Sequence, residues 1–405
     1  MTRLTLSNGL RVVFSPTSRA PLTALKLFTK VGSRHDGERP GISHFVEHLM
    51  LDRPSRSHLA AEQIEALGGE INAVTHREYT ALQAVVLAQH AARSLQVFSE
   101  LMEPLELTSD QVDRERDVIL QEIEHATDTQ SAAWDLFLRA LWGEDAFTRP
   151  IYGDPAIIRD VTPSELARHF ARYAVPERMV LSVAGPVAPD DVFEAAEQAL
   201  ILPADSPWQD RFSPVRTGPR RCRLVKDTKV AHLIVGVDAV PLADARRPVV
   251  KVLDMVLGQG AASRLYRSLR SRWGLVYEVA TAAMAFEDRG YLCAYTSCAP
   301  ANVGRVLEVL VEELVRLTRE PIAEAELEAV RVRYEGMLAR RFETVLAAAG
   351  ITGIEELFGC SEPFEQALAR VRQVDAGEAL LVATDLVDLD RIAVALVGPA
   401  EALEA

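Results

Sequence analysis

Cysteine is scarce in this chain of 405 residues, which contains only Cys222, Cys293, Cys298 and Cys360. No two of them have the C-x-x-C spacing that is typical of zinc ribbons and redox centres. All four lie in the second half, and they do not form the kind of disulfide framework that small secreted domains use. We therefore expect reduced thiols in a cytoplasmic protein.

Long apolar runs and an excess of basic residues are also missing. No run of about 18 apolar residues suggests a membrane span, and the N-terminus lacks the charged start and apolar core of a secretory signal. Asp and Glu number 58 against 44 Lys and Arg, so the net charge is −14. Nucleic acid requires a basic surface, which argues against it as a partner. The hydrophobic content of 48% is that of a globular protein.

The chain does contain the motif His44-Phe45-Val46-Glu47-His48. Positions i, i+3 and i+4 of a helix share one face, so two histidines one turn apart can bind the same Zn²⁺. The glutamate between them can take a proton from water at the metal. The order H-x-x-E-H is the inverzincin arrangement. The neighbouring residues are apolar and predict a buried helix, on which these polar side chains need partners.

A third metal ligand is best sought in residues 110–125, which predict another helix. Four side chains there could bind metal: Glu115, Glu122, Glu124 and His125. At about 100° per residue, Glu122 lies about 20° from Glu115, whereas Glu124 lies about 160° from Glu122. The apolar side of the helix is marked by Val118, Ile119 and Ile123. We expect Glu115 and Glu122 to face inward with it and Glu124 to face water. This geometry leaves open which member of the pair binds the metal.

These two segments together resemble the pitrilysin family of zinc metallopeptidases, which includes insulin-degrading enzyme and the mitochondrial processing peptidase. The motif E-R-D-V-I-L-x-E begins at Glu115, roughly 70 residues after H-x-x-E-H. The flanks Val31–Arg34 and Gly68–Thr75 also match. The resemblance covers nearly the whole chain.

The resemblance implies one Zn²⁺ per chain, with His44, His48 and Glu122 as its ligands. It also implies that Glu47 is the general base. Glu115 would support the site without binding the metal, as a carboxylate that orients a ligating imidazole does.

Substrate-binding residues are implied in both halves of the chain. The segment 263–277 resembles the family's S-R-L-…-L-R-…-G-L-x-Y sequence, whose Arg and Tyr correspond to Arg270 and Tyr277. Both side chains can donate to a peptide carbonyl that develops negative charge. Residues 70–74 would present a strand edge, with Asn72 and Ala73 facing the peptide backbone.

The second half repeats the predicted order of strands and helices. Alignment of residues 112–116 with residues 327–331 gives a shift of 215 residues. At this shift the ligand positions carry Gln259, Ser263 and Met337, so the second copy is expected to lack a metal site. A Pro-rich polar stretch at 202–210 predicts a linker between a catalytic domain, 1–208, and a degenerate domain, 220–405.

Each half predicts an α+β fold, because its strands and helices are segregated. We expect two tandem homologous α/β sandwich domains, each a sheet with helices packed on one face. The resemblance implies that two such chains, four domains in all, close into a clamshell around the substrate.

The predicted function is that of a zinc metalloendopeptidase acting on peptides or small unfolded polypeptides. We expect a homodimer, with a heterodimer containing an inactive paralogue as the alternative, and neither nucleic acid nor membrane as a partner. Two other functions stay open: a maturation protease for one modified peptide, and a non-catalytic peptide-binding subunit. The second usually has a degraded zinc motif, whereas this motif is intact.

Overall fold

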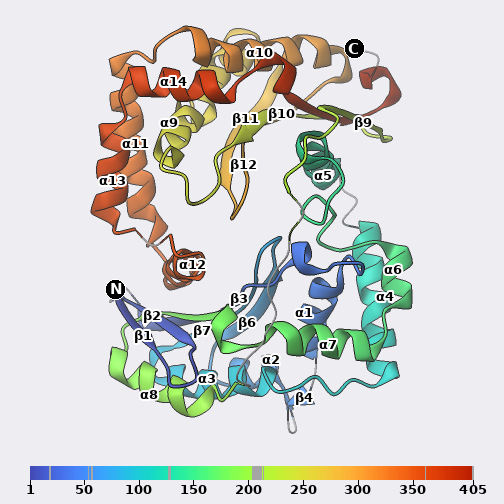
Figure 1. Ribbon diagram of the computed structural model, residues 1–405, viewed down its shortest axis with the longest axis vertical. Helices are drawn as coiled ribbons and strands as arrows, with labels where there is room; N and C mark the ends of the chain where they lie inside the picture. Colours follow the sequence, from blue (N-terminus) through green and yellow to red (C-terminus); the bar gives the residue numbers. More distant parts are fainter. Residues whose placement is uncertain are drawn as a thin grey trace. The chain divides into compact units, whose positions relative to one another are not determined.

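The computed structural model describes residues 1–17, 20–52, 54–55, 58–125, 129–202, 212, 214–360 and 362–403. Most of the predicted linker, including the domain end at 208, lies outside these residues. The chain forms two compact units (Figure 1). Unit 1 comprises Met1–His125, Arg149–Phe212 and Ala339–Ser361, and unit 2 comprises Ala126–Thr148, Ser213–Leu338 and Glu362–Ala405. The boundaries at 208 and 220 stay a prediction.

Unit 1 is built on a six-stranded sheet with the order β1-β2-β8-β3-β7-β6. Its strands are β1 (Thr2–Thr5), β2 (Arg11–Pro16), β3 (Leu22–Thr29), β6 (Glu70–Thr75), β7 (Thr80–Leu87) and β8 (Met179–Gly185). Only β2 and β8 pair in parallel. An Asn8-Gly9 turn joins β1 to β2, and Gly9 has φ +91°, a conformation that glycine adopts without a steric penalty. β6 is an edge strand. A separate two-stranded sheet contains β4 (Pro54–Ser55) and β5 (His58–Leu59).

Helices cover one face of the unit 1 sheet. They are α1 (Ile42–Asp52), α2 (Ala60–Glu65), α3 (Ala91–Leu101), α4 (Ser109–His125), α6 (Pro155–Asp160), α7 (Pro163–Tyr173) and α8 (Pro189–Ala199). The start of α7 is encoded locally: Pro163 is its first residue, and Thr162 and Glu165 form a capping box. Phe45 and Leu49 of α1 are buried in one cluster with Leu25 and Leu27 of β3.

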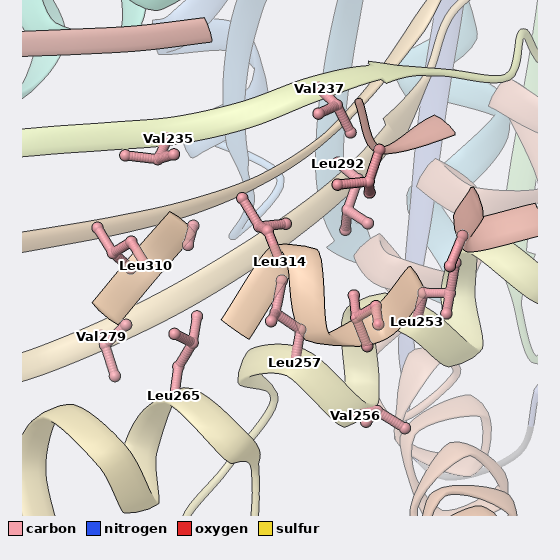
Figure 2. Packing of buried hydrophobic residues seen from close by; sticks show 14 of the residues in the cluster. Val235, Val237, Leu253, Val256, Leu257, Leu265, Val279, Leu292, Leu310 and Leu314 are labelled. Atoms are coloured by element: carbon pink, nitrogen blue, oxygen red, sulfur yellow. The ribbon is translucent and has the colours of Figure 1, made fainter. Parts of the chain in front are cut away.

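Unit 2 is built on a five-stranded sheet with the order β11-β12-β10-β13-β9. Its strands are β9 (Arg221–Val225), β10 (Ala231–Ala239), β11 (Val276–Ala285), β12 (Gly290–Cys298) and β13 (Ala393–Gly398). Its helices are α9 (Arg247–Gly258), the π-helix η4 (Tyr266–Arg272), α10 (Val303–Arg319), α11 (Glu324–Arg341), α13 (Phe364–Gln373) and α14 (Ala376–Leu386). Figure 2 shows Val235 and Leu292 of the sheet in one buried cluster with Leu257 of α9 and Leu314 of α10.

The second face of each sheet is covered by one helix that comes from the other half of the chain. In unit 1, α12 (Val345–Leu357) packs on β2, β3 and β8, and in unit 2, α5 (Thr129–Trp142) packs on β9, β10 and β13 (Figure 1). Leu357 is buried with Phe28, and Trp142 is buried with Ile234. The predicted fold class of two sheet-and-helix domains is confirmed, with this exchanged pair of helices added to it.

The main strands and helices of the two units follow the same order, but no single shift relates them. α4 and α11 begin 215 residues apart, as predicted. Helix α1 follows the strand β3 and α9 follows β10, and these two helices begin only 205 residues apart, at Ile42 and Arg247. The predicted counterparts Gln259 and Ser263 are therefore wrong, because the connections differ in length. Since α9 contains neither His nor Glu, it has lost the motif all the same.

None of the helices in the described ranges combines the length and the apolar character that are needed to cross a lipid bilayer.

The fit of α12 in unit 1 gives a first testable prediction. A Cβ atom at Gly353 would lie 2.1 Å from Cε2 of Phe28 and 2.9 Å from Cβ of Ser182, and both neighbours are fully buried. We expect Gly353→Ala to lower the free energy of unfolding by about 1–3 kcal/mol, measured by urea unfolding.

Gly350→Ala on the same helix is the matched control, because only Nζ of Lys26, 3.8 Å away, would lie near its Cβ. Alanine is a better helix former, so this variant should be neutral or gain up to about 1 kcal/mol. Equal losses in the two variants would contradict close packing at Gly353.

Candidate metal centre

Helix α1 is buried along nearly its whole length and packs against α4. Its motif residues His44 and Glu47 are buried, and His48 is partly buried. On α4 the buried residues are Val112 and Ile119. α1 and α4 thus bring the two motifs of the sequence, which lie far apart along the chain, into one place.

The two acidic residues of the α4 motif lie at the margin of its buried stripe. Glu115 and Glu122 are partly buried, whereas Glu124 is exposed, as predicted. The placement of Val118 on the apolar side is wrong, since its side chain is 49% exposed. Val118 lies about 100° around the helix from Ile119, beyond the glutamate pair. The pair therefore lies between the core and water.

Three donor atoms form a compact triangle. Nε2 of His48 lies 3.2 Å from Nε2 of His44 and 3.3 Å from Oε2 of Glu122, and the third side, from His44 to Glu122, measures 3.7 Å. Ligands placed tetrahedrally at about 2.0–2.2 Å from zinc lie about 3.3–3.6 Å apart. Among the described residues, this is the only group of three or more His, Cys, Asp and Glu side chains that could hold a metal ion.

Burial of an unpaired carboxylate oxygen supports the same interpretation. Oε2 of Glu122 is shielded from solvent and accepts no hydrogen bond. A buried acceptor without a partner is costly, and a cation at the triangle would satisfy it. Two imidazoles and one carboxylate are also a donor set that catalytic zinc uses. The residues present therefore fit a zinc ion.

Glu115 is placed differently from Glu122. Its Oε1 lies 2.7 Å from Nδ1 of His48, so it contacts the ring nitrogen that faces away from the triangle. Such a bond fixes the tautomer and the orientation of a ligating imidazole. The geometry thus assigns distinct positions to the two glutamates, which helix periodicity alone could not separate.

The two histidines differ in electrostatic environment. Burial, together with the charge of His48, lowers the pKa of His44 to about 3, which keeps its imidazole in the neutral form that binds metal. Burial also acts to lower the pKa of His48. The hydrogen bond and charge of Glu115, with the charges of Glu47 and Glu122, outweigh this effect and raise it.

Glu47 is held by a residue that the sequence reasoning did not single out. The hydroxyl of Thr75, at the end of β6, donates to Oε2 of Glu47 at 2.6 Å. Burial raises the pKa of Glu47, against the effects of Thr75 and His48, and the charge of Glu122 adds to the increase. Thr75 closes the matched flank Gly68–Thr75, so its place in that flank was the available signal.

The N-terminus of α1 is fixed by a buried carboxyl group. Asp36 accepts from the backbone N–H of Gly41 at 2.7 Å and from the hydroxyl of Ser43 at 2.6 Å. Burial raises the pKa of Asp36 to about 7. The hydroxyl of Ser43 also lies 2.9 Å from Nε2 of His169 on α7. This network ties α1 to α7 at the residue before His44, and no spacing rule in the sequence pointed to it.

The predicted substrate edge is an edge strand of the unit 1 sheet. Asn72 and Ala73 lie in β6, where Asn72 is exposed and the Ala73 methyl group is buried. Oδ1 of Asn72 accepts from the backbone N–H of Ala73 at 2.8 Å. The Asn72 side chain therefore folds back on its own strand.

Arg270 and Tyr277 contact each other in unit 2. The guanidinium carbon of Arg270 lies 5.3 Å from the centre of the Tyr277 ring. The pairing of β11 with β12 shifts register between Val276 and Val279, and Tyr277 lies within this bulge, 81% exposed. Bulges re-aim side chains and are common next to active sites.

Comparison with known proteins identifies the family. The profile of insulinase (peptidase family M16) matches residues 11–155, and that of the peptidase M16 inactive domain matches residues 160–333. An uncharacterized zinc protease of Mycobacterium tuberculosis is 30% identical, over 98% of this chain and 93% of its own length. This chain belongs to peptidase family M16. The family that the motifs indicated is therefore confirmed.

Further matches extend over nearly the whole chain. The uncharacterized zinc protease YmxG of Bacillus subtilis is 27% identical over 98% of both chains. The fold is shared with a protease from Helicobacter pylori, with a TM-score of 0.90 and 20% identity over 98% of this chain and 99% of that one. It is also shared with a peptidase M16 inactive domain from Pseudomonas fluorescens, with a TM-score of 0.89 and 16% identity over 98% of both.

The donor triangle predicts how metal content responds to substitution. We expect Glu122→Gln to lose most of its zinc, because the amide replaces a charged donor, while Glu124→Gln keeps it. Elemental analysis of the purified variants after dialysis measures this directly. If Glu122→Gln retains zinc and Glu124→Gln loses it, Glu124 and not Glu122 binds the metal.

Proposed function

We propose that this M16 protein is a zinc metalloendopeptidase that hydrolyses peptides or small unfolded polypeptides. The observation that carries the proposal is the triangle of His44, His48 and Glu122 beside the buried carboxylate of Glu47. When bound there, zinc would polarise a peptide carbonyl and make water more acidic.

Glu47 would act as the general base. It takes a proton from the attacking water and returns it to the leaving amine. A base works best when its pKa is close to the working pH, and burial moves the pKa of Glu47 upward in that direction. The hydrogen bond from Thr75 fixes the orientation of the carboxylate. Glu115 does the same for the ring of His48.

The edge strand β6 would bind the substrate backbone. An extended peptide can add to an exposed sheet edge through main-chain hydrogen bonds, which tolerates varied sequences. The N–H of Ala73 would become available when the Asn72 side chain turns away from it. Arg270 and Tyr277 would donate to the carbonyl oxygen as it gains negative charge.

A non-catalytic role is the competing candidate, because the same fold occurs in a chain of complex III2 from Candida albicans. The TM-score is 0.86 and the identity 18%, over 99% of this chain and 97% of that one. The intact motif and the donor triangle favour the peptidase.

Substitution of Glu47 tests the proposal. Glu47→Gln should keep its zinc, since Glu47 is outside the triangle, and should lose about 10²–10⁴-fold in peptidase kcat, as expected when a general base is removed. Hydrolysis of a quenched fluorescent peptide and metal analysis are measured on the same preparation. If zinc-loaded Glu47→Gln turns over peptide as fast as the wild type, Glu47 is not the general base. If the wild-type protein binds zinc but cleaves no peptide, the non-catalytic candidate is favoured.

We further propose that the active form is a homodimer in which Arg270 and Tyr277 act on the zinc site of the other chain. One chain carries both the zinc motif and the Arg/Tyr pair, so two copies can supply both halves of a substrate chamber. A heterodimer with an inactive paralogue is the alternative.

Mixing two inactive variants tests this arrangement. If the pair acts in trans, Glu47→Gln mixed with Tyr277→Phe gives a dimer with one intact zinc site facing one intact pair, and part of the activity returns. Subunit exchange is verified by mass spectrometry of differently tagged chains. Exchange without recovered activity would show that the pair acts in cis or not at all.

A further inference from the structure

A short basic stretch of unit 2 stands out against the acidic chain. Residues 255–277 contain four arginines and no Asp or Glu, although the chain as a whole has a net charge of −14. Arg264 is neutralised by Glu326, to which it donates twice, at 3.2 and 2.9 Å. Within the described structure, Arg270 and Arg272 have no carboxylate partner and pack on aromatic rings. Arg270 and Arg272 therefore bring positive charge that no described carboxylate neutralises.

The centre of this charge is an exposed indole that two guanidinium groups contact. Trp273 is 47% exposed. The guanidinium carbons of Arg272 and Arg305 lie 4.9 and 5.2 Å from its ring centre. Arg272 ends the π-helix η4, and Arg305 lies in the first turn of α10, so two separate elements supply the two charges. We name these three residues the Arg–Trp–Arg stack.

The stack has the chemistry of a carboxylate site. Guanidinium groups that lie against a ring keep their N–H edges available, and those edges match the two oxygens of a carboxylate. Arg305 already pairs with Glu308 at 2.8 Å, but both side chains are exposed, and exposed pairs of this kind are weak. A second carboxylate can therefore compete for Arg305, and Arg272 has no carboxylate partner among the described residues. The indole offers an apolar face to the methylene groups of an acidic side chain.

The position of the stack connects it to substrate. It follows Arg270 by two residues on the same element, and Arg270 contacts Tyr277. π-Helical turns are rare and occur frequently at functional sites.

We propose that the Arg–Trp–Arg stack binds a carboxylate of the peptide substrate and gives the enzyme a preference for acidic peptides. The carboxylate belongs either to an Asp or Glu side chain or to the free C-terminus of the peptide. This inference rests on the proposed peptidase function, which supplies the reason for a peptide ligand.

Paired peptides test the preference. Two sets of quenched fluorescent peptide pairs are used. In the first set, the two members differ by Glu or Gln at one position, and this position is moved along the peptide. In the second set, the two members differ only in a C-terminal free acid or amide. The wild type should cleave the carboxylate member of one pair with about tenfold higher kcat/KM, mainly through a lower KM, since a charge-assisted contact is lost in the other member. A preference for Glu over Gln identifies a side-chain carboxylate as the ligand, and a preference for the free acid over the amide identifies the C-terminus.

The double variant Arg272→Gln/Arg305→Gln should lose this preference and cleave the neutral peptides as the wild type does. Arg319→Gln is the matched control, because Arg319 is an exposed arginine at the other end of α10. Its preference should equal that of the wild type. A double variant that keeps the wild-type preference, or a wild type with none, overturns the proposal.

Binding measurements separate this inference from the peptidase proposal. If the wild type cleaves no peptide, the proposed function fails, and the same peptide pairs are titrated by calorimetry. Tighter binding of the carboxylate member, lost in the double variant, supports the stack as a carboxylate site. Equal binding of both members overturns it, as does binding of phosphatidylserine vesicles or RNA at the stack in place of acidic peptides.

Discussion

The packing of α1 against α4 is the contact on which the metal centre depends. His44 and His48 come from one helix and Glu122 from the other, and each side of the donor triangle is between 3.2 and 3.7 Å long. A shift of about 1 Å between the helices would move the carboxylate out of reach of a shared ion. Phe45 of α1 and Ile119 of α4 are fully buried in one cluster. Ordinary core packing thus sets the geometry of a polar site.

Three further contacts fix the polar residues on this framework. Asp36 holds the start of α1, Thr75 holds Glu47, and Glu115 holds His48. Each joins a residue of α1 to a different segment of unit 1, so the site is oriented from several directions. Side chains that are locked in this way lose little freedom when a substrate binds. The main strands and helices of the second unit follow the same order, but α9 contains neither His nor Glu and contributes buried apolar residues to the core of that unit.

The exchanged helices show a limit of reasoning from local patterns. The repeated order of strands and helices predicted two domains of one plan, and the two sheets confirm it. Nothing in residues 345–357 indicates that they cover the sheet of unit 1, since any apolar helix has the same pattern. The strand β8 was likewise not predicted to lie between β2 and β3. The placement of such a helix or strand depends on which uncovered apolar face lies close to it in the folded chain. Local sequence patterns do not contain that information.

The sequence by itself determined the motif helix, the candidate ligands His44 and His48 and the shared face of the acidic pair, because helical periodicity is a local property. Its motifs also sufficed to place the chain in its family. Helical periodicity could not separate Glu122 from Glu115, since the two lie about 20° apart on one helix. The resemblance assigned the metal to Glu122, and only the tertiary structure showed which groups face each glutamate. It also showed the support from Asp36 and Thr75 and the convergence of Arg272 and Arg305 on Trp273. These contacts join residues that are distant in the chain, and packing of the whole domain decides them.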